Sequence, residues 1–321
     1  MFWRRSKDRR PAVTLITGFL GSGKTTLLNR LLANTEGFRV GVLVNDFGEV
    51  NIDAELVVGV ERDKISLANG CICCTIRGDL IRSVNRLLKS KDALDHILVE
   101  ASGISEPLPI AQTFLKMQAE ERLTLDGIVA LIDAEGFMDL RPDQRLLAEG
   151  QIKVADLIVL NKADLVDEDK LALLRRVVRS SVPSARLFAT EQADVPLEIL
   201  ASTRMPADRA LPDEDGHHHP ERQFETVALS ATTPLSLERF QRAMVTLPTW
   251  LYRAKGFVEL VELPKHRAEF HLVGRRLTVT TSRRWKRGER VSRLVFIGDA
   301  DGFDAQVLDE ALRRSVDTSQ T

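Results

Sequence analysis

The stretch Gly18-Phe-Leu-Gly-Ser-Gly-Lys-Thr25 matches the pattern GxxxxGK[ST] in full. The apolar run Val13–Thr17 before it predicts a β-strand, and Thr25–Leu32 after it predicts an α-helix. In that setting, glycines let backbone N–H groups turn toward phosphate oxygens, and the helix N-terminus favours their negative charge. We therefore predict a phosphate-binding loop whose contacts come from Gly18, Gly21, Ser22, Gly23, Lys24, Thr25 and Thr26.

Four residues in and beyond this loop have the chemistry of phosphoryl transfer. Lys24 can reach the β- and γ-phosphates of a nucleotide, and the Thr25 hydroxyl can ligate magnesium. Glu100 ends the apolar run Ile97–Glu100 and is the predicted acidic residue on the magnesium side. Gly103 follows three residues later, and its amide is predicted to sense the γ-phosphate.

The sequence Asn161-Lys-Ala-Asp164 follows another apolar run, Leu157–Asn161, about 140 residues after the phosphate loop. A carboxylate at Asp164 can accept hydrogen bonds from the ring N–H and the exocyclic amine of guanine together, a paired contact that adenine cannot supply. Asn161, Lys162 and Asp164 are therefore predicted to bind the base, and the nucleotide is predicted to be GTP rather than ATP.

The chain has three cysteines, Cys71, Cys73 and Cys74, all within four residues. An odd number so close together cannot form a disulfide framework and indicates a reducing compartment or a metal site. Three soft ligands suit zinc, copper(I) or another thiophilic ion and leave a fourth position open, as expected for a metal that can leave. A redox pair of Cys71 with Cys74 is the second interpretation, and inert packing is the third.

Strands that alternate with helical periodicity predict an α/β domain with a mostly parallel sheet, and the chain changes character after about residue 205. The predicted order is a basic tail at 1–10, a nucleotide-binding domain at 11–205, an acidic and His-containing linker at 206–222, and a smaller α+β domain at 223–321. The predicted strands of the first domain are Val13–Thr17, Val40–Asn45, Ile97–Glu100, Ile128–Asp133 and Leu157–Asn161. Those of the second are Phe224–Leu229, Phe257–Leu263, Ala268–Val273, Leu277–Thr281 and Arg293–Ile297, with helices near 236–246 and 304–315.

Composition excludes several classes of protein. The 321 residues are 44% hydrophobic and 28% charged, with a net charge of −1, so the chain is neither disordered by composition nor globally basic. It shows no signal peptide or membrane-spanning run, and we expect a cytoplasmic protein. Residues 265–293 hold ten Lys or Arg against two acidic residues. This basic run favours docking of a client protein over solvation alone, and RNA binding ranks third.

Taken together, the motifs resemble those of the CobW-type metallochaperone GTPases. The resemblance rests on Gly18–Thr25, Asn45-Asp-Phe-Gly-Glu49, Gly70-Cys-Ile-Cys-Cys74, Glu100-Ala-Ser-Gly-Ile-Ser-Glu-Pro107, Asn161-Lys-Ala-Asp164, Arg253-Ala-Lys-Gly-Phe257 and Leu294-Val-Phe-Ile-Gly298. It implies a P-loop GTPase that binds a transition metal, most often zinc, at the three cysteines and delivers it to a client apoprotein. The alternatives are a cobalt or iron chaperone for cobalamin or nitrile hydratase maturation, and an RNA-docking GTPase with a structural metal.

Carried over by residue, the resemblance assigns Lys24 and Thr25 to phosphate and magnesium, Glu100 to the magnesium side, and Asp164 to guanine. Asp46 and Glu49 fall in the segment that resembles the family's first switch, where water positioning, magnesium binding and metal ligation all stay open. Ile104 stands where many small GTPases carry a water-orienting Gln. We therefore expect slow intrinsic hydrolysis, accelerated by a partner or by a GTP-dependent homodimer.

Overall fold

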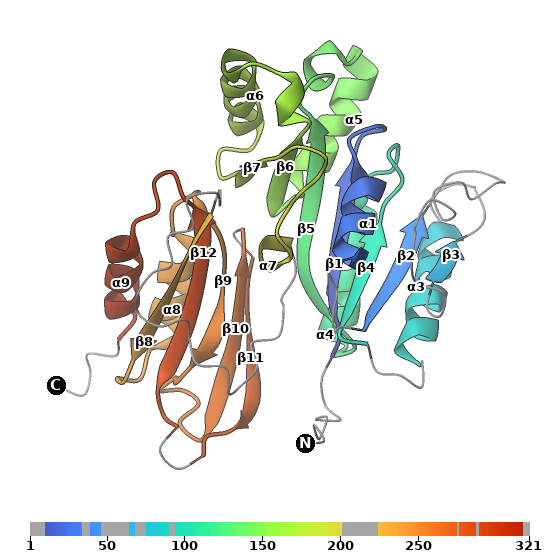
Figure 1. Ribbon diagram of the computed structural model, residues 1–321. Helices are drawn as coiled ribbons and strands as arrows, with labels where there is room; N and C mark the ends of the chain where they lie inside the picture. The colour runs from blue at the N-terminus through green and yellow to red at the C-terminus, as the bar shows by residue number, and fades with distance from the viewer. Residues whose placement is uncertain are drawn as a thin grey trace. The chain divides into compact units, whose positions relative to one another are not determined.

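The computed structural model describes residues 10–33, 39–45, 64–67, 75–89, 94–200, 224–274, 276–286 and 289–316 (Figure 1). The chain divides into two compact units. The first runs to Pro183 and includes Ala189–Ala201; the second holds Ser184–Phe188 and the chain from Ser202 onward. The predicted linker at 206–222 and the predicted boundary at 205 lie outside the described residues and stay predictions.

A largely parallel sheet is the centre of the first unit. Its described strands run in the order β3-β2-β4-β1-β5-β6-β7. They are β1 (Ala12–Gly18), β2 (Val40–Asn45), β3 (Lys64–Leu67), β4 (His96–Glu100), β5 (Thr124–Asp133), β6 (Leu157–Asn161) and β7 (Leu187–Ala189). The pairs β2–β3, β2–β4, β1–β4, β1–β5 and β5–β6 are all parallel. The five predicted strands are present, and the sequence analysis missed the short strands β3 and β7.

Helices and helical turns connect these strands (Figure 1). They are α1 (Lys24–Ala33), α3 (Thr75–Leu88), α4 (Pro107–Ala119), η1 (Phe137–Asp139), α5 (Pro142–Lys153), η2 (Ala163–Leu165), α6 (Glu168–Ser181) and α7 (Leu197–Leu200). Their apolar residues recur at helical spacing, so one face of each long helix is buried. In α3, for example, Leu80, Val84 and Leu87 pack into one core with Ile110 and Phe114 of α4.

The strand register explains why distant motifs meet. Ile16 of β1 lies opposite Glu100 of β4, and Asp133 of β5 lies opposite Asn161 of β6. These residues stand at the carboxyl ends of parallel strands, which all reach the same edge of the sheet. Ligands of open α/β sheets bind outside this edge, so the topology brings the phosphate loop, the acidic strand end and Asn161 together.

The second unit is an antiparallel five-stranded sheet in the order β11-β10-β9-β12-β8, with two helices packed on one face. Its elements are β8 (Phe224–Ala231), α8 (Leu237–Val245), β9 (Leu251–Val258), β10 (His266–Val273), β11 (Arg276–Arg284), β12 (Ser292–Asp299) and α9 (Ala305–Arg314). The fold class predicted from the sequence, a P-loop-type α/β domain followed by an α+β domain, is confirmed. The strand predicted at Phe257–Leu263 is wrong, because β9 ends at Val258 and Leu263 N donates to Leu260 O at 3.0 Å in a turn.

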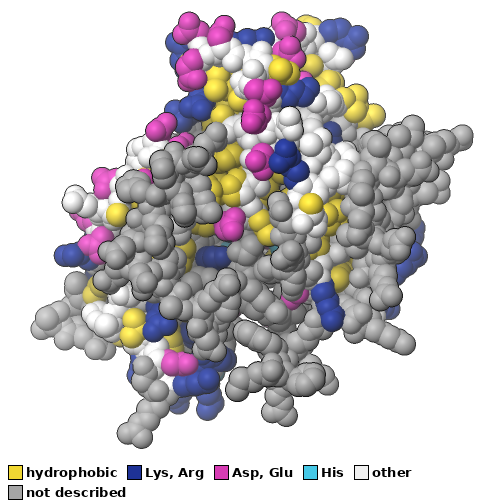
Figure 2. Space-filling model, viewed as in Figure 1, with side chains coloured by type: hydrophobic (Ala, Val, Ile, Leu, Met, Phe, Trp, Pro, Cys, Tyr) yellow, Lys and Arg dark blue, Asp and Glu magenta, His cyan; other side chains and the backbone are white. Residues whose placement is uncertain are grey.

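Much of the basic run lies on β10, on the edge strand β11 and in the chain after it. Figure 2 shows Lys and Arg side chains at the lower end of the view. The protein itself engages several of them: Arg283 Nη1 lies 2.7 Å from Glu289 Oε2, and the Arg267 guanidinium lies over the Phe257 ring, 3.4 Å from its centroid. Of the helices that the structure describes, none is long and apolar enough to cross a membrane.

Candidate nucleotide site

The backbone of the phosphate loop requires its glycines. Gly18, Gly21 and Gly23 have φ angles of +140°, +75° and +100°, a region that side-chain-bearing residues rarely adopt. A Cβ at Gly18 would overlap the carbonyl oxygen of Leu131, and one at Gly23 would overlap Asn161 Nδ2. The loop is therefore folded tightly against the ends of β5 and β6, where only glycine fits.

The side chains of Lys24 and Thr25, which follow the loop glycines, both make hydrogen bonds near the predicted phosphate and magnesium positions. Lys24 is 7% exposed, and its Nζ donates to Phe19 O at 3.2 Å, a carbonyl of the loop itself. Thr25 Oγ1 donates to Glu100 Oε1 at 3.0 Å, which joins the start of α1 to the end of β4. Glu100 is 2% exposed. A hydroxyl and a carboxylate side by side are hard oxygen ligands of the type that magnesium prefers.

Ser22 of the phosphate loop is buried, and its hydroxyl group makes no hydrogen bond within the described protein. Ser22 is 1% exposed, and its Oγ has no hydrogen-bond partner among the described residues; the same is true of Thr17 Oγ1 at the end of β1. Buried polar groups are normally hydrogen-bonded, so two such hydroxyls beside one loop suit a site that receives a polar ligand. Thr26, the last predicted contact, is exposed.

Asn161 connects the phosphate loop to a second loop. Its Nδ2 donates to Ser22 O at 2.9 Å, and its Oδ1 accepts from Ala193 N at 2.7 Å. The side chain is 2% exposed. Gln192 and Ala193 have positive φ angles of 48° and 54°, so this second loop takes a shape unusual for non-glycine residues. The sequence analysis missed this loop because its conformation has no glycine to signal it.

Lys162 and Asp164, which follow the end of β6, have different surroundings. Lys162 takes the left-handed conformation, with φ of 61°, and its Nζ lies 2.5 Å from Asp133 Oδ2. Asp133 Oδ1 also accepts from the backbone N–H groups of Glu135 and Gly136, at 3.1 and 3.2 Å. Asp164 is exposed, as a carboxylate that binds a ligand from solvent should be. Asp133 was not predicted as a site residue, although it ends an apolar strand as Glu100 does.

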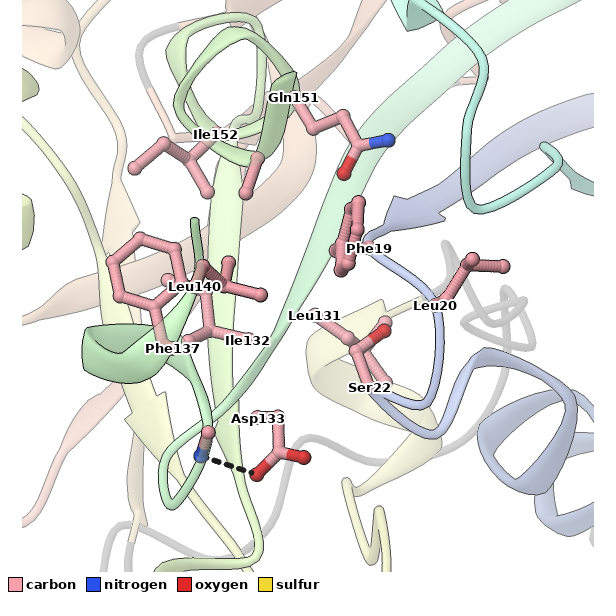
Figure 3. A pocket seen from close by; sticks show the side chains of 12 residues that line it. Phe19, Leu20, Ser22, Leu131, Ile132, Asp133, Phe137, Leu140, Gln151 and Ile152 are labelled. Atoms are coloured by element: carbon pink, nitrogen blue, oxygen red, sulfur yellow. Dashed lines mark hydrogen bonds between the residues drawn. The ribbon is translucent and has the colours of Figure 1, made fainter. Parts of the chain in front are cut away.

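Gly103 packs against the phosphate loop. A Cβ there would stand 2.9 Å from Leu20 N, so a larger residue would push the loop away. Behind it, Gln151 of α5 donates from Nε2 to Gly103 O and to Ser105 O, both at 3.1 Å. Figure 3 shows Gln151 and Ile152 of α5 across a cavity from Phe19 and Leu20 of the loop; the cavity encloses about 90 Å³. The sequence analysis did not single out Gln151.

Five predicted site residues lie outside the described residues, namely Asp46, Glu49, Cys71, Cys73 and Cys74. Within the part of the chain that the structure describes, no group of three or more His, Cys, Asp or Glu side chains could hold a metal ion. The predicted metal site and the predicted first switch therefore stay predictions. Helix α3 begins at Thr75, directly after the last cysteine.

A parallel sheet with a glycine loop between β1 and α1 defines the class of this protein, which is that of the P-loop nucleotide-binding proteins. Residues 12–189 match the family model of the CobW/HypB/UreG nucleotide-binding domain. Residues 224–316 match the cobalamin synthesis protein CobW C-terminal domain. The chain belongs to the CobW family, which confirms the resemblance found in the sequence and the prediction of a GTPase.

Relatives of known name match over most of the chain. The zinc chaperone CobW of Sinorhizobium sp is 32% identical, over 95% of this chain and 97% of its own. The zinc chaperone YjiA of Escherichia coli (strain K12) is 31% identical, over 89% and 93%. The zinc-regulated GTPase metalloprotein activator 1 of Dictyostelium discoideum is 31% identical, over 85% and 68%.

Proposed function

We propose that this protein is a GTP-driven zinc chaperone, which binds zinc at Cys71, Cys73 and Cys74 and hands it to a client apoprotein when GTP is hydrolysed. Family membership and the names of the relatives support the class of function. The observation that supports the site most directly is the contact of Thr25 Oγ1 with Glu100 Oε1 at the mouth of the phosphate loop.

The phosphate end of the site fits a magnesium nucleotide. Thr25 and Glu100 would hold the magnesium ion, which supplies positive charge against the phosphate oxygens when bound. Lys24 Nζ, which donates to the carbonyl oxygen of Phe19 at 3.2 Å, lies within the loop, where an ammonium group can donate to a phosphate oxygen. The buried Ser22 hydroxyl and the backbone amides of the loop add further donors.

The base end fits guanine. Asp164 is exposed in η2, three residues after the end of β6, where its carboxylate can accept from the two adjacent N–H donors of guanine. Asn161 stabilises this end of the site, because its side chain bonds to both the phosphate loop and the Ala193 loop. A bound nucleotide would therefore contact the phosphate loop at one end and the segment after β6 at the other, and the buried Asn161 side chain connects these two regions.

A packed route leads from the phosphate end to helix α3, which begins directly after Cys74 in the sequence. Gly103 lies against the loop, and α4 begins four residues later at Pro107. Buried residues of α4 share a core with Leu80 and Val84 of α3, which starts immediately after Cys74. A γ-phosphate that moves the Gly103 turn can therefore act on the start of α3 and on the cysteines. By linkage, zinc must then raise the affinity for GTP by the same factor as GTP raises that for zinc.

Zinc affinity measured in two nucleotide states tests this function. Zinc and cobalt(II) dissociation constants are measured by chelator competition, with magnesium and either GTPγS or GDP. We expect tighter zinc binding with GTPγS, by roughly 5- to 150-fold for a typical coupling of 1–3 kcal/mol. The triple variant with Cys71, Cys73 and Cys74 changed to Ser should lose metal binding and keep nucleotide binding.

The matched control is Asp164→Ala. It should keep zinc binding in the absence of nucleotide and lose the GTPγS effect at nucleotide concentrations that saturate the wild type. Equal zinc affinity with GTPγS and GDP would refute the chaperone cycle and leave a structural metal site. Tighter cobalt(II) than zinc binding in the GTPγS state would instead favour the cobalt alternative.

A further inference from the structure

Gln151 is a buried polar side chain whose described hydrogen bonds both go to the turn beside the phosphate loop. It lies near the end of α5 and is 1% exposed. Its Nε2 donates both of its hydrogen bonds to backbone carbonyls of one short segment, Gly103 O and Ser105 O, each at 3.1 Å. Because both contacted atoms are acceptors, the amide must present its NH₂ group to the turn.

The turn itself is closed by hydrogen bonds between two of its serines. Ser105 N and Ser105 Oγ both donate to Ser102 O, at 3.0 and 2.8 Å, which closes the turn locally. Gln151 binds two further carbonyls of the turn, those of Gly103 and Ser105. A trans peptide is planar, so holding the Gly103 carbonyl also fixes the direction of the Ile104 N–H.

The other side of the turn meets the phosphate loop. Gly103 lies so close to Leu20 that a single added Cβ would approach Leu20 N to 2.9 Å. The turn is therefore held between two groups, the loop backbone on one side and the Gln151 amide on the other. Ile104 remains 48% exposed in this arrangement, on the side away from the core.

We propose that Gln151 is a positioning residue for GTP: its amide sets the orientation of the Gly103–Ser105 turn from which the γ-phosphate is recognised. The inference rests on the proposed function, since it assigns the γ-phosphate to this site. GDP shares the loop and base contacts and lacks the γ-phosphate. Loss of the Gln151 amide should therefore weaken GTP more than GDP.

The remaining atom of the amide supports this assignment. Gln151 Oε1 is buried and has no hydrogen-bond partner among the described residues. It belongs to the lining of the cavity of about 90 Å³ beside Phe19 and Ser22, which has room for water (Figure 3). The NH₂ group of Gln151 is therefore bonded to the turn, whereas its oxygen has no bond within the described protein. An apolar side chain would fill the same space without leaving a buried oxygen unpaired, so packing alone does not explain a glutamine here.

The test compares Gln151→Met, which keeps length and burial without any donor, with the wild-type full chain. Dissociation constants for GTPγS and GDP are measured with magnesium. We expect the preference for GTPγS over GDP to fall about tenfold, equivalent to 1.4 kcal/mol. The control Ile152→Val changes a neighbouring residue of α5 that lines the same cavity, and it should leave the preference unchanged.

A second variant gives a signature that a packing role would not produce. In Gln151→Glu, burial and two facing carbonyls oppose the charge, and buried Glu can titrate near pH 8–9. Protonation restores one donor to the turn. The GTPγS preference of this variant should therefore approach that of the wild type at about pH 6 and fall as the pH rises to about 9, whereas Gln151→Met shows no such trend.

Three results would overturn the inference. If both nucleotides weaken equally in Gln151→Met, or neither does, Gln151 only stabilises α5. If Gln151→Glu shows no dependence on pH relative to the wild type, the donated hydrogen bond is not what matters. If the wild-type protein binds no guanine nucleotide, the proposed function fails first, and the inference fails with it.

Discussion

Removal of the Asn161 side chain tests whether one buried amide holds the site together. In Asn161→Ala, the donor to Ser22 O and the acceptor from Ala193 N are both lost. Asn161 is only 2% exposed, so water cannot replace either bond without entering the core. Leaving one buried partner unsatisfied costs about 1–3 kcal/mol, so the loss of two predicts about 2–6 kcal/mol of destabilisation.

Thermal and urea unfolding of the full chain without nucleotide measure this cost. For a unit of this size each kcal/mol lowers Tm by roughly 2–4 °C, so a fall of roughly 4–24 °C is expected for the first transition. Asp164→Ala, at an exposed position only three residues away, should stay within about 0.5 kcal/mol of the wild type. A loss below about 1 kcal/mol in Asn161→Ala would refute the reasoning, because the two loops would then hold their places without the amide.

Two further changes probe the loop and the second unit. Gly23→Ala places a Cβ on Asn161 Nδ2 at a φ of +100°, so about 1–3 kcal/mol of strain should accompany loss of nucleotide binding; unchanged GTPγS affinity would contradict this. Hydrogen bonding from Arg283 lowers the pKa of Glu289 to about 2. Arg283→Ala should move the Glu289 titration, followed by NMR, up toward 4.5, and the stability that the pair adds should be present above about pH 4.5 and lost as the pH falls toward 2. A Glu289 midpoint that stays near 2 in the variant would show that Arg283 is not the cause.

The sequence predicted the parts of the site that local chemistry determines. Glycines with positive φ, and an acidic residue at the end of an apolar strand, can be read from the chain because each leaves a local pattern. The loop at Gln192 and Ala193 leaves no such pattern. Its positive φ angles occur together with a tertiary bond from Ala193 N to Asn161 Oδ1, a partner 32 residues away in the chain.

Strand β9 shows the same limit in the second unit. Arg253 and Lys255 interrupt its apolar pattern, so the sequence favoured the more apolar stretch that follows. In the folded unit, β9 is an inner strand between β10 and β12, and both of these residues are buried there. Neighbouring strands that are distant in sequence decide which residues of a strand are buried. The hydrophobic periodicity of the strand's own sequence therefore does not predict that burial.

The segment from Asp133 to Lys153 touches both ends of the site. At its start, Asp133 pairs with Lys162, which follows β6 in the segment predicted to bind the base; near its finish, Gln151 donates to the Gly103 turn beside the phosphate loop. Between them, the Arg145 guanidinium donates to Phe137 O at 3.0 Å and stacks on the Phe137 ring, so η1 and α5 are tied together. Contiguous packed contacts of this kind are one way in which two sites can be coupled. In the proposed cycle, the guanine base and the γ-phosphate would therefore both act on this one structural element, which would let the protein respond to the two ends of the nucleotide together.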